Sequence, residues 1–324
     1  MTPPSDNMGV TNPELHPTHT TTCSLDWLQY SIPWPAGIAT MPQGGPALIN
    51  VLKSALPPSD AITVTGELLH GGRGYTDGMQ STHARLFWHR LNRMQHIGVL
   101  MTGEDLRAVL TIPFPHDALV RWCVAKAKKI ARLDFALDVF DPQANPTDVL
   151  HMWKRGDVGT PARYVELRSS YTSTREGGVI EAPTVYVGAP DSDRRIRVYD
   201  KAKEKGVPGP WTRIEIQMRD ARAWSLARSC ATYGIERAGL TAIRDFVTIK
   251  SLGWWSRATT GTPVYIEPVG RAETNTDKWL REVCLPAIEK RAKEQIALGS
   301  WALYDAVERT LADVLRQTDV RRSK

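Results

Sequence analysis

The stretch IARLDFALDVFD, residues 130–141, predicts a β-strand with two different faces. Side chains alternate across a strand, so residues two apart share a face. One face is apolar and the other is mainly polar: Leu133, Phe135, Leu137 and Val139 against Arg132, Asp134, Ala136 and Asp138. A strand of this kind packs one face on a core and leaves the other for solvent or for chemistry.

Two segments further along the chain repeat this pattern. RRIRVYDK, residues 194–201, places Ile196 and Val198 on one face, and TRIEIQM, residues 212–218, alternates in the same way. The link GAPDSD, residues 188–193, is rich in turn-forming residues, so residues 184–201 predict a β-hairpin. We expect these three strands to pair in one sheet.

The order of the predicted elements indicates the fold class. Strands come in runs, with helices between or after them, which favours an α+β fold over a doubly wound parallel one. We expect a mainly antiparallel central sheet with flanking helices and a helical C-terminal region. The predicted helices after Asp117 and Asp220 would use these two aspartates as N-caps.

The chain divides into three predicted parts. Residues 1–22 are polar and rich in proline, and we expect a disordered leader. Residues 23–240 form the main domain, and residues 241–324 form a mainly helical region for DNA binding or dimer contact, with helices at about 276–298 and 300–317. No signal peptide or membrane span is predicted, so we expect a cytoplasmic protein without a membrane partner.

Charge and cysteine content narrow the class of protein. The 324 residues include 41 Lys and Arg against 35 Asp and Glu, a net charge of +6. Ten of the basic residues and only four acids lie between positions 194 and 228. This local excess suits a polyanionic partner such as DNA. The four cysteines form no CxxC pair, which argues against a zinc ribbon or a redox dithiol.

The polar faces of the three strands predict a site. If the strands pair, Asp134, Glu215, Tyr199 and Lys201 can converge. Carboxylates bind hard divalent cations, and a tyrosine can attack a phosphodiester that such a cation polarises. The same alternation is also typical of a sheet with an ordinary solvated face, where the acids would form cross-strand salt bridges with Arg213 or Arg197.

The blocks SLDWLQYSIPW, GVLMTGEDLRAV, ARLDFALDVFD, TVYVGAPDSDRRIRVYDKAKEKG and WTRIEIQMRDARA resemble, in order and spacing, the replication initiation factor family. These are the trans-acting Rep proteins of rolling-circle plasmids and related phage-like elements. The most specific block is YVGAPDSDRRIRVYDKAKE, residues 186–204, followed by TRIE at 212–215. The resemblance implies an enzyme that nicks one strand at a double-stranded origin, forms a 5′-phosphotyrosine intermediate and later rejoins the strand.

The resemblance also implies roles for single residues. Tyr199 would be the nucleophile, with Lys201 or Arg197 stabilising the charge that develops on the phosphate. Asp134 and Glu215 would bind Mg²⁺ or Mn²⁺, with Glu166 as candidate third ligand. No His-hydrophobe-His pair is present in the sequence, which favours carboxylate ligands. The residues expected to contact DNA phosphates are Arg194, Arg195, Lys203, Lys205 and Arg213.

The expected partners are double-stranded origin DNA, single-stranded DNA, a host helicase and a second copy of the chain in a homodimer. Two alternatives remain open at this stage. One is a non-catalytic origin-binding replication regulator on the same scaffold. The other is a strand-transfer protein of a phage or mobile element, which would differ in its substrate and not in its chemistry.

Overall fold

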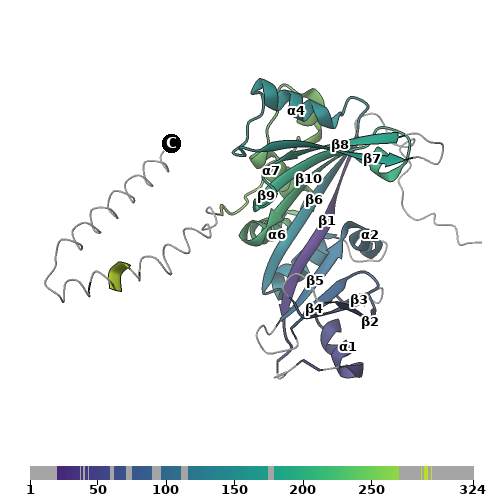
Figure 1. Cartoon of the computed structure of the whole chain (residues 1–324), viewed down its shortest axis with the longest axis vertical. Coiled ribbons are helices and arrows are strands. Elements are labelled where there is room, and N and C mark those ends of the chain that lie inside the picture. The colour runs from purple at the N-terminus through teal and green to yellow at the C-terminus, as the bar shows by residue number, and fades with distance from the viewer. Residues whose placement is uncertain are drawn as a thin grey trace, which may run out of the picture. The chain divides into compact units, whose positions relative to one another are not determined.

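The computed structural model describes residues 20–269, apart from 37, 39–40, 43, 59–61, 71–74, 90–95, 111–115 and 174–178, together with residues 286, 288–290 and 293. Its centre is a ten-stranded sheet in the order β2-β3-β4-β5-β1-β6-β10-β9-β8-β7 (Figure 1). Every pairing in the sheet is antiparallel. The predicted α+β class with an antiparallel sheet and flanking helices is confirmed.

The strands are β1 (Thr20–Pro33), β2 (Val64–His70), β3 (Asp77–Ser81), β4 (Arg85–Trp88), β5 (His96–Thr102), β6 (Lys129–Phe140), β7 (Val165–Ser173), β8 (Val179–Val187), β9 (Arg194–Asp200) and β10 (Thr212–Arg219). The helices are α1 (Gly45–Lys53), α2 (Gly103–Leu110), α3 (His116–Lys126), α4 (Pro146–Arg155), α5 (Lys201–Lys205), α6 (Asp220–Tyr233), α7 (Ile235–Phe246) and α8 (Gly253–Ala258).

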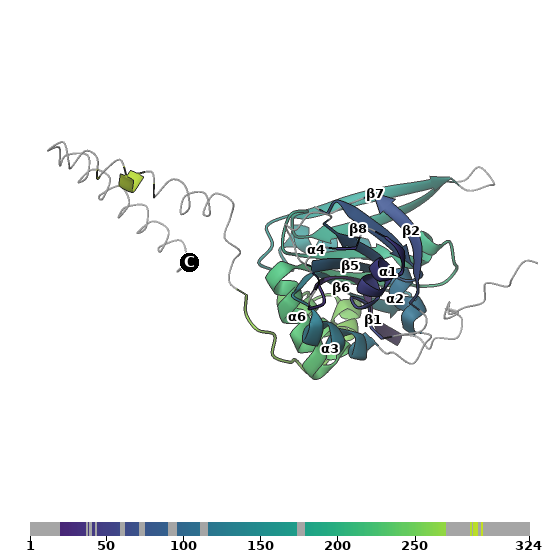
Figure 2. The same ribbon diagram turned by 90° about the horizontal axis from the view of Figure 1, so that it is seen from below.

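The core lies between the apolar face of the central strands and a layer of helices. α6 packs against β6 and α3 (Figure 2). α7 packs against α6 and also contacts β1 and β6. Phe135 on β6 is fully buried in this layer. A side chain on Gly239 of α7 would overlap the Phe135 ring, so this glycine lets the helix approach the strand closely.

The predicted hairpin is formed by β8 and β9, in which Val187 pairs with Ile196. β10 lies between β9 and β6, as required for the predicted convergence of polar side chains. Tyr199 stands opposite Arg213 across β9 and β10, and Arg197 stands opposite Glu215. The polar face of β6 is not solvated, however, because Asp134 is only 1% exposed.

Strand β1 carries a β-bulge that sets the site described below. Leu25 pairs with Phe135 and Trp27 pairs with Asp134, so Asp26 is an extra residue with no partner on β6. The bulge changes the phase of the strand, because Leu25 and Leu28 both face the core although they are three residues apart.

The two predicted N-caps are wrong in detail. The residue before α6 is Arg219, and Asp220 is the first residue of the helix, with a φ of 48° and its carboxylate 2.5 Å from the Lys129 ammonium. Asp117 is the second residue of α3 and instead accepts a hydrogen bond from the backbone N–H of Ile235 at 2.8 Å. It therefore caps the start of α7.

The contact pattern separates a unit that ends at Val269 from a unit that begins at Gly270. α7 spans position 240, where the sequence predicts a boundary, and that boundary stays a prediction. Residues 1–19 of the predicted leader, 1–22, lie outside the described residues, and residues 20–22 are not part of a leader because they begin β1. The predicted helices at 276–298 and 300–317 also lie outside the described residues, but for the five positions named above. Within the described ranges, no helix is long and apolar enough to cross a membrane.

Candidate active site

The candidate nucleophile, Tyr199, lies beside a carboxylate and an ammonium group. The Tyr199 hydroxyl is 3.5 Å from a carboxylate oxygen of Glu215 and 3.5 Å from the Lys201 ammonium. The residue is 5% exposed. Burial, and then the nearby Glu215 carboxylate, raise the pKa of Tyr199 well above its usual range. The phenol is therefore protonated at neutral pH, and it needs a proton acceptor before it can attack.

Glu215 and Asp134 lie on adjacent strands with both side chains buried. Glu215 pairs with Ala136, two residues from Asp134, which makes the two acids diagonal neighbours. Burial raises the pKa of Glu215 to about 8, Arg197 opposes this shift, and the charges of Asp26 and Asp134 add to it. Burial likewise raises the pKa of Asp134.

Each of these acids already has an arginine partner. A guanidinium nitrogen of Arg197 lies 2.5 Å from the Glu215 carboxylate. Arg132 binds Asp134 with two nitrogens, at 2.9 Å through Nε and 2.5 Å through Nη2. The arginines offset the cost of holding these charges away from water. Lys201 in turn is ion-paired with Glu204, and burial lowers the pKa of Lys201.

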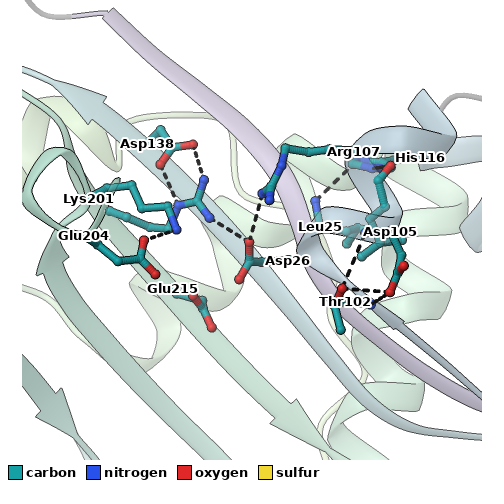
Figure 3. Close-up of polar contacts among 12 residues, drawn as sticks. Leu25, Asp26, Thr102, Asp105, Arg107, His116, Asp138, Lys201, Glu204 and Glu215 are labelled. Atoms are coloured by element: carbon teal, nitrogen blue, oxygen red, sulfur yellow. Dashed lines mark hydrogen bonds and ion pairs between the residues drawn. The ribbon is translucent and has the colours of Figure 1, made fainter. Parts of the chain in front are cut away.

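Sequence reasoning missed Asp26, which the bulge directs into this cluster. Its carboxylate accepts a hydrogen bond from Arg213 at 2.7 Å and lies 3.6 Å from Arg197 and 3.9 Å from Arg107. Figure 3 shows it between Asp138 and Lys201 on one side and Arg107 on the other. Burial opposes ionisation of Asp26, yet Arg213 and then Arg197 lower its pKa. A side chain on Gly103 would overlap this carboxylate.

A sequence signal for Asp26 exists in the spacing of the buried leucines. In an unbroken strand Leu25 and Leu28 would face opposite sides. Apolar residues three apart, followed by regular alternation through Tyr30 and Ile32, indicate one extra residue between them. That residue is Asp26 or Trp27.

Arg213 is expected from the sequence to contact DNA phosphate, but its side chain is buried among carboxylates. Its side chain is 3% exposed and holds both oxygens of Asp138, at 2.7 Å through Nε and 2.7 Å through Nη2. Its remaining terminal nitrogen binds Asp26. All three nitrogens of the guanidinium therefore bind carboxylates inside the protein, and a side chain that is 3% exposed is not accessible to a DNA phosphate.

The structure separates Glu166 from the other two acids. Glu166 lies on β7, and β8 and β9 stand between that strand and β10. Three strand spacings of about 4.8 Å put it roughly 14 Å from Glu215, too far to share one ion. Its carboxylate pairs instead with Arg168 at 2.6 Å and Arg195 at 3.3 Å. The sequence could not reveal this, because the order of strands in the sheet is not written in any one strand.

The remaining predicted DNA contacts are dispersed. Arg194 lies on the opposite face of β9 from Tyr199, with its guanidinium 4.3 Å from the centre of the Phe246 ring. Arg195 shares the Tyr199 face but stacks on Tyr186 at 3.9 Å. Lys203 and Lys205 lie on α5, and both are exposed. Of the five, these two lysines are the most accessible to a phosphate.

The donor set suits a hard divalent cation in its chemistry. Mg²⁺ is commonly bound by one or two carboxylates together with water and substrate phosphates. Asp134 and Glu215 supply two oxygen donors whose mutual repulsion a cation would relieve, and Asp26 adds a third negative charge nearby. As the side chains lie, no three His, Cys, Asp or Glu residues of the described ranges are grouped closely enough to hold an ion.

Comparisons with known proteins agree with this architecture. A family model described as "Replication initiation factor" matches residues 128–283. The solved structure of the rolling circle replication initiator protein from Geobacillus stearothermophilus is similar to this chain. The two share 22% sequence identity and a TM-score of 0.55, with 80% of this chain and 91% of that chain covered. At this identity the likeness shows the fold alone. A comparison with curated proteins finds no match.

The matched segment begins just before β6 and includes Asp134, Tyr199 and Glu215. The resemblance to the replication initiation factor family that the sequence predicts is therefore confirmed.

Proposed function

We propose that the protein initiates rolling-circle replication by nicking and rejoining one strand of origin DNA through a covalent bond to Tyr199. The observation that carries this proposal is the position of the Tyr199 hydroxyl, 3.5 Å from both Glu215 and Lys201 on a face that Asp134 shares. A phenol between a proton acceptor and a cation is the arrangement that a tyrosine nucleophile requires.

The proposed reaction is a transesterification. The Tyr199 oxygen attacks the scissile phosphorus, a bond forms between them, and the bond from phosphorus to the ribose 3′ oxygen breaks. The phenolic proton passes to the ionised form of Glu215, 3.5 Å away, and a pKa of about 8 makes this carboxylate a stronger base than an ordinary glutamate. The leaving 3′ oxygen takes up a proton from water and becomes the free 3′-OH. Rejoining reverses these steps.

Arg197 is the group that we expect to meet the phosphate. Its side chain is 39% exposed, while its guanidinium carbon lies 5.0 Å from the centre of the Tyr199 ring. It can therefore contact solvent and the nucleophile together, and its charge would stabilise the negative charge that develops on the phosphate oxygens. Lys201, at the hydroxyl itself, would stabilise the phenolate.

Asp134 and Glu215 would hold Mg²⁺ or Mn²⁺, with Asp26 close enough to complete the charge of the site. The cation would polarise the phosphodiester and neutralise part of its charge. To bind it, Glu215 would exchange its contact with Arg197, which frees that guanidinium for DNA. We expect Asp134→Asn and Glu215→Gln to lose cleavage and to stop responding to added metal. Cleavage at the wild-type rate by either variant would remove that residue from the proposed site.

Tyr199→Phe tests the nucleophile directly. The variant keeps the ring and loses only the hydroxyl, so we expect it to fold and to bind origin DNA within a few fold of wild type. Incubation with supercoiled origin plasmid and Mg²⁺ should give no nicked product and no DNA bound to protein after SDS treatment. Tyr233→Phe, which changes an exposed tyrosine on α6, is the matched control. Normal nicking by Tyr199→Phe would refute the proposal.

A non-catalytic origin-binding regulator is the second candidate. The observations that favour it are the near-complete burial of Tyr199 and the pairing of both acids with arginines. Such a protein would bind origin DNA and would leave the plasmid supercoiled with either metal. The plasmid assay therefore separates the two candidates. An origin partner is common to both, and a host helicase and a homodimer stay predictions.

A further inference from the structure

A group of aromatic and imidazole rings lies where β4 ends and β5 begins. Tyr75 precedes β3, and its ring stacks on Phe87 with centroids 6.1 Å apart and an angle of 25° between the planes. The same ring is 5.3 Å from the His89 ring and 5.7 Å from the His96 ring. We call these four residues the ring cluster.

Gly98 gives Tyr75 its place in the ring cluster. An added Cβ at Gly98 would come within 2.7 Å of the Tyr75 hydroxyl and 2.8 Å of the ring carbon that bears it. The Tyr75 ring therefore lies directly over Gly98 on the sheet surface, where any other residue would overlap it. Phe87 pairs with Gly98, so both face the side on which Tyr75 lies.

The ring cluster is on the same face of the sheet as the candidate active site. Thr102 pairs with Trp27, and Trp27 pairs with Asp134, so these three side chains share a face. Gly98 lies four residues before Thr102 on β5 and therefore faces the same way. A strand of DNA that follows this face can reach both places.

Two polar atoms of the ring cluster lack partners. Nε2 of His89 and Nδ1 of His96 are buried and make no hydrogen bond within the part of the chain that the structure describes. A buried polar atom without a partner is costly, and a bound ligand that supplies the partner offsets that cost. Burial and then the charge of nearby Lys128 lower the pKa of His96, so its ring is neutral at pH 7.

We propose that the ring cluster binds a nucleobase of single-stranded DNA. Tyr75 would stack on the base, the His89 and His96 rings would turn to bring their buried nitrogens to its edge, and Lys128 would contact a phosphate. Lys128 suits that role because its side chain is exposed and its backbone N–H binds Ser31, which pairs with Gly98. Aromatic stacking with a neighbouring cation is a common way in which proteins hold unpaired bases.

A transition metal is the other ligand that two histidines suggest. Within the described ranges, however, no third His, Cys, Asp or Glu joins them in a metal-binding group. The stacked geometry of Tyr75 and Phe87 also serves a flat ligand and not an ion. The observations therefore favour the base, and the experiment below includes the metal as an outcome.

This inference rests on the proposed function, because that function supplies single-stranded DNA as the ligand. The test therefore measures DNA binding and not cleavage, so that the two proposals can fail separately. The probe is a fluorescent single-stranded oligonucleotide of mixed sequence, titrated in EDTA with Tyr199→Phe protein, and the readout is anisotropy. In that background we expect Tyr75→Ala to bind about tenfold more weakly, because base stacking is worth that order of affinity. Tyr75→Phe should bind within about twofold, since it keeps the ring, and Tyr233→Ala should bind as the parent does.

Photo-crosslinking places the contact without any change to the ring cluster. Tyr199→Phe protein irradiated with an oligonucleotide that contains 5-bromouracil should give crosslinked tryptic peptides covering residues 74–85, 86–90 or 94–107. Crosslinks confined to other peptides would overturn the proposal. So would unchanged oligonucleotide binding by folded Tyr75→Ala, or tight binding of Ni²⁺ or Zn²⁺ alone that His89→Ala abolishes. If the wild-type protein does not nick origin plasmid but the binding and crosslinking results are as expected, the proposed function is refuted and the proposed base site is retained.

Discussion

Replacing Arg213 by lysine separates a structural role for this residue from a DNA-binding one. The arginine makes three charge-assisted hydrogen bonds at 2.7 Å, two to Asp138 and one to Asp26, and its side chain is 3% exposed. A lysine keeps the charge but presents one compact ammonium, which cannot span two carboxylates on different strands. We therefore expect it to keep one of the three bonds.

The size of the effect follows from the bonds that are lost. Hydrogen bonds to charged groups contribute about 1.5–3 kcal/mol each, so two of them amount to about 3–6 kcal/mol. The whole free energy of unfolding of a typical protein is about 5–15 kcal/mol. With a urea m-value of about 3 kcal/mol/M, Arg213→Lys should lower the unfolding midpoint by about 1–2 M.

The assay is urea unfolding followed by circular dichroism, together with anisotropy of labelled origin DNA. Arg168→Lys is the matched control, because Arg168 also binds a carboxylate, Glu166 at 2.6 Å, but its side chain is 55% exposed. Its loss should cost less than about 1 kcal/mol. A midpoint for Arg213→Lys within about 0.3 M of wild type, together with much weaker DNA binding, would show that Arg213 contacts DNA and that the burial argument fails.

Three further outcomes follow from the site. Gly103→Ala should displace the Asp26 carboxylate, which lowers the nicking rate and lowers the free energy of unfolding by about 1–3 kcal/mol. Gly44→Ala is the control, because there is open space at its Cβ, and it should change neither quantity. Equal effects of the two substitutions would contradict this prediction. Glu215 has a folded pKa of about 8, above the value of about 4.3 in an unfolded chain, so the folded state holds the extra proton between these values and loses stability as pH rises through them. Glu215→Gln should flatten this slope in unfolding curves at pH 5–8, and an unchanged slope would assign it to another group. Glu166→Gln should leave the metal response of nicking as it is, and a changed response would return Glu166 to the site.

The sequence predicts those parts of the site that depend on one strand at a time. Alternation in β6, β9 and β10 was sufficient to place Asp134, Tyr199 and Glu215 on polar faces, and the antiparallel sheet then brought them together. Glu166 also lies on a strand, but its distance from the others depends on β8 lying between β7 and β9, which alternation cannot reveal. The sequence predicts Arg213 as a phosphate contact or as a partner of the acids on neighbouring strands, and it does not reveal Asp26, which is 187 residues away in the chain.

Caps were less predictable than strands for a similar reason. Asp117 has the side chain of a cap and stands at the start of a helix, yet the N–H that it satisfies belongs to Ile235, on a different helix. A local rule identifies a residue that can accept such a bond and does not say which donor will reach it. Tertiary packing makes that choice.

The unpaired position in β1 can be removed without a gap in the ladder. Shortening the chain by the single residue Asp26 would make Leu25 and Trp27 consecutive, still opposite Phe135 and Asp134, and would place Leu25 and Leu28 two residues apart in regular alternation. The extra residue therefore lets Leu25 and Leu28 both face the core while Asp26, between them, points to the other side and carries a negative charge. A relative whose strand lacks this one extra residue would be expected to lack the carboxylate that faces Arg213, Arg197 and Arg107.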